Sequence, residues 1–151
     1  MNNKYKNVVI PVDLEHPSSW YNALPMAVEF ARNNEAALHV ITVAAQADIP
    51  AVAIHLPKDI DDQIISATAE RLKRLVQQEV PSDIETLTAV GQGRIYKEVL
   101  RLAANADADL IVMASHRPEI TDYLIGANAA NVMRHAPCSV MVVREQDRRA
   151  A

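Results

Sequence analysis

The stretch Asn7-Val8-Val9-Ile10-Pro11-Val12-Asp13 contains an unbroken apolar run and ends on a carboxylate. Runs that are apolar almost throughout recur at 38–43, 110–114 and 140–143. Continuous apolar runs, rather than alternating ones, are typical of strands buried on both faces of a sheet. Pro11 is unusual in a central strand, although its place near the end of the run limits the loss of backbone hydrogen bonding.

A fifth run, at 84–90, alternates more, with threonines between apolar neighbours, and predicts a more exposed strand. The five runs begin at residues 8, 38, 84, 110 and 140, so successive starts are 30, 46, 26 and 30 residues apart. Most of these steps have the size of a right-handed βαβ unit. The longest step includes 44–58, which we interpret as a loop or flap.

Segments with helical periodicity separate the strands. Apolar residues recur at i, i+3, i+4 and i+7 from Leu24 and again from Ala129. Further helices are predicted at 59–80, where acidic residues come first and basic residues follow, and at 95–106. Pro25 means that the first helix either begins near Leu24 or is kinked there. The alternation predicts an α/β protein with a mostly parallel sheet.

Length, charge and cysteine content narrow the class of protein. The 151 residues fit one domain, 1–151, with a flexible tail at 144–151. With 15 Lys+Arg against 19 Asp+Glu the net charge is −4, which disfavours nucleic-acid binding. A single cysteine and the lack of a long apolar segment favour a reducing, cytoplasmic location without a membrane span.

Polar residues follow two of the predicted strands. Asp13 ends the first, and Ser115-His116-Arg117-Pro118 follows the fourth, with Gly126-Ala127-Asn128 opening the last helix. In parallel sheets ligands bind outside the carboxyl ends of the strands. Cationic donors and helix-start amides suit phosphate, and a carboxylate suits a sugar hydroxyl or base amine, so the pattern suggests a nucleotide. The alternative is a turn cap at Asp13, a solvated loop and a plain helix-entry glycine.

Four stretches are similar to the universal stress protein family: 7–13, 110–118, 123–132 and 134–143. Ser-His-Arg-Pro at 115–118, with Gly-Ala-Asn-Ala-Ala after it, most resembles the F/G-type subgroup that binds ATP. The resemblance implies a five-stranded parallel sheet of order 3-2-1-4-5 with helices on both faces, the adenine nucleotide alpha hydrolase-like fold. It also implies a cytoplasmic homodimer formed through the last strand, 139–144, that acts in stress regulation.

The resemblance further implies ATP, or AMP or ADP, at the switch point between strands 1 and 4, with Mg²⁺ held through the phosphates. Pro11, Val12 and Asp13 would line the base and ribose, with backbone from Val43. Residues from the fourth strand and the last helix would surround the ribose and phosphates: Met113, Ala114, Ser115, His116, Arg117, Gly126, Ala127 and Asn128.

The chain departs from the family's ATP signature, which is Gly-x-x-Gly, nine residues, and then Gly followed by Ser or Thr. Here Ala114 and Arg117 replace the first two glycines, eight residues follow, and Ala127 replaces the hydroxyl residue. Arg117 either replaces amide contacts or fills the pocket. Besides a nucleotide-binding regulator, two functions therefore stay open: a slow ATPase, and a dimeric scaffold with a decayed pocket.

Three other signals are discounted. Gly91-Gln92-Gly93 is half of a dinucleotide fingerprint and favours a plain strand-to-helix turn. Cys138 precedes an apolar strand and favours a buried structural thiol. His39, within the second strand, is interpreted as a satisfied or solvated histidine, because no histidine pair has metal-ligand spacing.

Overall fold

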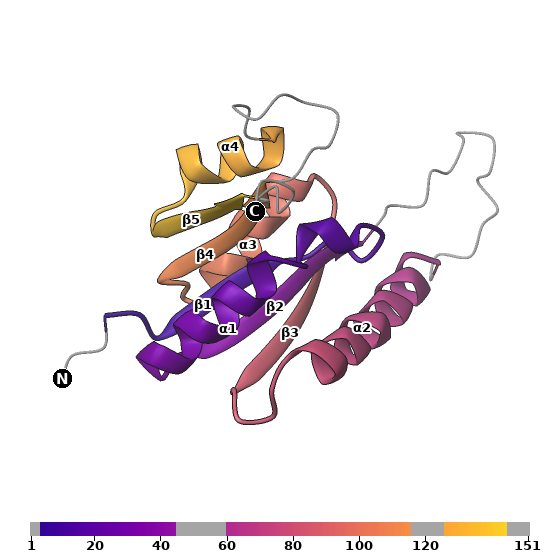
Figure 1. Ribbon diagram of the computed structural model, residues 1–151. Coiled ribbons are helices and arrows are strands. Elements are labelled where there is room, and N and C mark those ends of the chain that lie inside the picture. The colour runs from indigo at the N-terminus through magenta and orange to yellow at the C-terminus, as the bar shows by residue number, and fades with distance from the viewer. Residues whose placement is uncertain (1–3, 45–59, 116–125, 145–151) are drawn as a thin grey trace, which may run out of the picture.

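A computed structural model describes residues 4–44, 60–115 and 126–144. Its five strands form one parallel sheet of order β3-β2-β1-β4-β5 (Figure 1). The strands are β1 (Asn7–Pro11), β2 (Ala37–Ala44), β3 (Thr86–Gln92), β4 (Leu110–Ser115) and β5 (Ser139–Arg144). The predicted strands, their parallel pairing and their order are confirmed.

Helices cover both faces of the sheet, as predicted (Figure 1). They are α1 (Ala23–Asn34), α2 (Ile60–Glu79), α3 (Ile95–Asn105) and α4 (Ala127–His135), with a 3-10 turn, η1 (Pro17–Ser19), before α1. The core that includes α1 and α2 contains Leu24 and Leu72, and the core that includes α3 and α4 contains Val99 and Val132. The sheet therefore separates two apolar layers.

The central strands contribute side chains to both layers in alternation. Val8 and Ile10 of β1 pack in the α1–α2 core, whereas Val9 packs in the α3–α4 core, and all three are 0% exposed. Because both faces are covered, the strand reads as a continuous apolar run in the sequence. The edge strand β3 is more open, as predicted, and its Leu87 is 45% exposed.

Both prolines are placed where they cost little. Pro25 is the third residue of α1, where an N–H has no partner within the helix, so the helix begins before it without an internal break. Pro11 ends β1. Its neighbour Val12 donates its N–H to the carbonyl of Ile41 on β2, at 2.8 Å. Successive residues of a strand direct their peptide groups to opposite neighbouring strands. Because the N–H of Val12 bonds to β2, the nitrogen of Pro11 faces β4.

The pairing of β1 with β4 ends before Pro11. Val9 pairs with Ile111 at the last β1–β4 position, whereas β1 stays paired with β2 as far as Pro11 and Ile41. A residue without an N–H cannot extend the ladder toward β4. The two central strands thus part at their carboxyl ends, which is where the sequence placed the site.

Two predicted segments fall largely outside the described residues. The loop expected at 44–58 lies outside them, apart from Ala44, which ends β2. In the expected tail, Arg144 is the last residue of β5, and 145–151 lie outside the described part. Within the described ranges, no helix combines the length and hydropathy that crossing a bilayer requires.

Candidate functional site

A cleft of about 630 Å³ lies at the carboxyl ends of the strands, a volume within the usual range for small-molecule sites. Its wall includes residues at or just beyond the ends of β1, β2 and β4, together with residues of α2, α3 and α4. The chain runs from β1 to β2 on one side and reaches β4 on the other, so the cleft lies at the topological switch point. This is the predicted location.

The structure brings together most of the predicted site residues that it describes. Those in the cleft wall are Pro11, Val12, Asp13, Val43, Met113, Ala114 and Asn128. Ser115, Gly126 and Ala127 are described but are not part of that wall. His116 and Arg117 lie outside the described residues. All the residues predicted for the base and ribose at the ends of β1 and β2 line the cleft, and Met113, Ala114 and Asn128 line it on the other side.

Asp13 organises the turn that follows β1. Its Oδ1 accepts the backbone N–H of Glu15 at 3.0 Å, and its Oδ2 lies 2.9 Å from Nδ1 of His16. Its own N–H donates to Oγ of Ser19 at 2.8 Å. The carboxylate therefore makes turn-capping contacts, which was the simpler of the two interpretations left open. It also lines the cleft with its side chain 52% exposed, so lone pairs stay available to a ligand.

Thr42 and Val43 form the β2 side of the cleft. The buried hydroxyl of Thr42 donates to the carbonyl of Val12 at 2.7 Å and ties β2 to β1 beyond their last paired residues. Val43 directs its peptide groups to the same side as Ile41, whose carbonyl already accepts the N–H of Val12. The peptide groups of Val43 thus face the β1 side of β2, where the cleft lies, as the resemblance implies.

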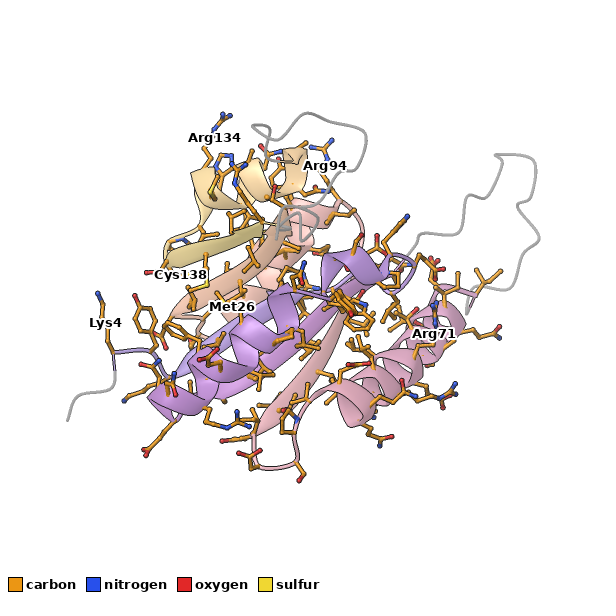
Figure 2. The ribbon with its side chains drawn as sticks, viewed as in Figure 1. Lys4, Met26, Arg71, Arg94, Arg134 and Cys138 are labelled. Atoms are coloured by element: carbon orange, nitrogen blue, oxygen red, sulfur yellow. The ribbon has the colours of Figure 1, made fainter. Side chains whose placement is uncertain are left out.

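One face of α2 contributes a wall that was not predicted. Ile64, Thr68 and Arg71 line the cleft. They stand at i, i+4 and i+7, so they share one helix face, and this spacing is the signal that the sequence contained. Nη1 of Arg71 donates to Oε1 of Glu15 at 2.6 Å (Figure 2). An ion pair therefore connects α2 to the turn after β1.

The turn between β3 and α3 was also missed as part of the site. Gly93 adopts φ 133°, a left-handed value that favours glycine, and it lines the cleft together with Ile95. The turn itself is held by Glu98, whose Oε1 accepts the N–H of Gln92 at 3.0 Å. The plain strand-to-helix turn predicted from Gly91-Gln92-Gly93 is confirmed, but it has the further role of forming a cleft wall.

Helix α4 places its first turn at the β4 side of the cleft. Gly126 is its N-cap residue and Asn128 lines the cleft. The first turn carries no acidic side chain, whereas Arg134 and His135 lie in the last turn. The partial positive charge of the helix start is therefore uncompensated by the helix's own side chains, which favours an anionic group near it.

The described wall contains three charged side chains: Asp13, Glu15 and Arg71. Across the described ranges 4–44, 60–115 and 126–144, no group of three or more His, Cys, Asp or Glu residues could hold a metal ion. These charged side chains can therefore form hydrogen bonds and ion pairs around an apolar cleft.

Cys138, predicted as a buried structural thiol, is only partly buried, and His39 is partly buried as well. Nε2 of His39 lies 3.0 Å from Oδ1 of Asn7, so the ring is satisfied, and burial lowers the pKa of His39. Burial also raises the pKa of the Cys138 thiol, with a smaller contribution from the charge of Asp109. A thiol whose pKa is raised is less reactive at neutral pH, which supports a structural role for Cys138.

The sequence and the fold of this chain are similar to those of known proteins. The model of the universal stress protein family matches residues 4–144. Universal stress protein G of Escherichia coli O157:H7 is 29% identical over 143 residues, covering 93% of this chain and 99% of that protein. Universal stress protein UspA of Lactobacillus plantarum has a TM-score of 0.69 at 25% identity, covering 93% and 98% of the two chains. An Archaeoglobus fulgidus universal stress protein in complex with dAMP has a TM-score of 0.56 at 16% identity, covering 91% and 97%.

Proposed function

Because this chain belongs to the universal stress protein family, we propose that its cleft binds an adenine nucleotide, either ATP or else AMP or ADP. We further propose that nucleotide occupancy regulates the protein's action in a stress response. The observation that carries the proposal is the cleft at the point where β1 and β4 part. The solved dAMP complex of a relative with this fold supports the class of ligand.

In this proposal the nucleotide runs across the carboxyl ends of the strands. Pro11, Val12 and Asp13 line the base and ribose, and Val43 offers backbone groups to the adenine. The carboxylate of Asp13 accepts a ribose hydroxyl while keeping its bonds to the turn, since an ionised carboxylate has about four acceptor sites.

The phosphates lie toward β4 and α4. The residues proposed to surround them are Met113, Ala114, Ser115, His116, Arg117, Gly126, Ala127 and Asn128. The start of α4 attracts negative charge, and a Mg²⁺ ion enters with the phosphates rather than through protein carboxylates. With alanine at 127, where the family signature has a hydroxyl residue, this chain offers less to the metal than its relatives do.

We propose a regulatory rather than a catalytic role because phosphoryl transfer needs a group that positions the attacking water or nucleophile. The only candidate for that role in the predicted site is His116.

The protein acts as a cytoplasmic homodimer paired through β5, residues 139–144. In the part of the chain that the structure describes, this strand forms one edge of the sheet, so a second copy can pair along its outer side.

Titration calorimetry tests the nucleotide site. The wild-type protein should bind ATP with Mg²⁺, and AMP without it, with dissociation constants below the millimolar range. Asp13→Ala should weaken both ligands by about ten- to a hundredfold, because a charge-assisted hydrogen bond contributes about 1.5–3 kcal/mol. Asp83→Ala is the matched control, since Asp83 pairs with Arg32 on the surface and is not in the cleft wall.

Two outcomes would contradict the proposal. If neither nucleotide binds to the wild type, the nucleotide-independent scaffold is the better interpretation. If ATP is hydrolysed and His116→Ala abolishes phosphate release, the protein is a slow ATPase. Identifying the nucleotide that copurifies with the protein gives an independent check.

A further inference from the structure

Arg71 supplies the positive charge in the part of the cleft wall that the structure describes, where the other charged groups are Asp13 and Glu15. Its Nη1 lies 2.6 Å from Oε1 of Glu15, across 56 residues of sequence. Figure 2 shows the Arg71 side chain between α2 and the turn that follows β1. The guanidinium is thus held in place by a specific partner on the neighbouring element.

The position of α2 determines the end of the cleft at which Arg71 lies. Helix α2 packs on β2 and β3, whereas α4 packs on β4 and β5. Asn128, in the first turn of α4, and Arg71, on α2, therefore lie toward opposite sides of the cleft. A nucleotide with its phosphates at α4 directs its base toward α2. Arg71 then stands beside the base rather than beside the phosphates.

A purine base gains affinity by stacking on a flat group, and the described wall contains no aromatic side chain. The apolar side chains of this wall are aliphatic, such as Val43, Ile64 and Ile95. A guanidinium is planar and delocalised, and it stacks on aromatic faces, which an ammonium group cannot do. The N–H groups of a guanidinium lie in its plane, so the bond to Glu15 leaves the face of the half-exposed Arg71 group free of that contact.

We propose that Arg71 is a base-binding residue, whose guanidinium stacks on the purine, and that Glu15 is its positioning residue. This inference rests on the proposed adenine-nucleotide function and adds a contact from α2 to it. The Arg71–Glu15 bond is made before the ligand arrives. Less side-chain freedom is therefore lost on binding than with an unheld arginine.

The test compares AMP with ATP in four proteins: wild type, Arg71→Ala, Arg71→Lys and the control Arg74→Ala. Stacking of one base contributes enough that Arg71→Ala should weaken binding by about tenfold. The factor should be equal for AMP and ATP, because the lost contact is to the base. Arg71→Lys should not restore affinity, because lysine lacks the planar group. Arg74, which is exposed on the same helix and pairs with Glu70, should show no effect.

The same titrations separate the ways in which the inference can fail. Equal affinity of wild type and Arg71→Ala overturns it while leaving the proposed function intact. A loss that is larger for ATP than for AMP and is restored by lysine overturns it too, because Arg71 then contacts phosphate. If the wild type binds neither ligand, the proposed function itself fails.

The positioning role of Glu15 has its own readout. Glu15→Ala should weaken AMP binding, and Glu15→Gln, which keeps an acceptor oxygen, should largely restore it. Combining Glu15→Ala with Arg71→Ala should cost no more than Arg71→Ala alone, since one residue acts through the other. Additive losses would contradict this role. Melting of the nucleotide-free variants should stay close to wild type, because both side chains are largely exposed.

Discussion

Asp13 shows how a single residue can satisfy its own turn and still face a ligand. Its two carboxylate oxygens contact Glu15 and His16, and Ser19 bonds to its backbone. Sequence pattern left a turn cap and a ligand contact as alternatives, because position after a strand does not reveal local side-chain bonds. The contacts establish the cap, and the place of Asp13 in the cleft wall supports the ligand contact as well.

His39 gives a prediction about stability and pH. Burial lowers its pKa, and the negative charge of Glu85 opposes this effect less strongly. The folded protein therefore disfavours the protonated ring. As the pH falls below the ordinary histidine pKa of about 6.5, the unfolded state binds more protons and stability decreases. We expect urea denaturation to show lower stability at about pH 5.5 than at about pH 7.5, with a smaller difference in His39→Gln.

The comparison with the variant isolates this effect from other groups. The carboxylates of Asp83 and Glu98 have lowered pKa values because they bond to Arg32 and Arg101, respectively. Their contribution is present above their unfolded pKa values and is lost at more acidic pH, in both proteins alike. An identical pH dependence of wild type and variant would show that His39 is not responsible.

At the scale of the element, strands were easier to predict than the contacts made by helices. The central strands β1 and β4 are buried on both faces, so each of them gives a continuous apolar run in the sequence. Helix α2 was predicted from its periodicity and charge order, but its cleft-lining residues Ile64, Thr68 and Arg71 were not assigned to the site. Which helix face meets the strand ends depends on packing between distant segments, and the periodicity of one helix cannot specify it.

The tie between β1 and β2 gives a second prediction. The buried Thr42 hydroxyl donates to the Val12 carbonyl, just where the pairing of β1 with β2 ends. Thr42→Val keeps the shape but removes the donor, so we expect a loss of about 1–2 kcal/mol in the free energy of unfolding. Urea denaturation measures it. Thr42→Ser keeps the hydroxyl and should lose less; equal losses in the two variants would point to packing instead.

For the whole molecule, the topology explains why one end of the sheet carries the site. A parallel sheet brings the carboxyl ends of all its strands to one edge, and the strand order turns outward in both directions from β1 and β4. The sequence therefore located the site from Asp13 and the polar stretch 115–117, which lie about a hundred residues apart in the chain. The sequence left the phosphate half open, because Arg117 in place of a glycine can either replace amide contacts or fill the pocket, and His116 and Arg117 lie outside the described residues.

The proposed dimer and the nucleotide site should be separable, since the described cleft wall includes no residue of β5. β5 and β3 are the two edges of the sheet. Val142, half-buried in β5, would be covered by a second copy. Val142→Lys should convert the dimer to a monomer in sedimentation velocity, because a second copy that covers this side chain on the sheet face would bury an unpaired charge.

The opposite edge provides the matched control for this last prediction. Leu87 is exposed on β3, so Leu87→Lys should leave a dimer that forms through β5 intact. The Val142→Lys monomer should keep the wild-type affinity for AMP and a cooperative melting transition, which distinguishes loss of pairing from loss of fold. A variant that stays dimeric would contradict assembly through β5. A folded monomer that no longer binds AMP would mean that the partner copy completes the site.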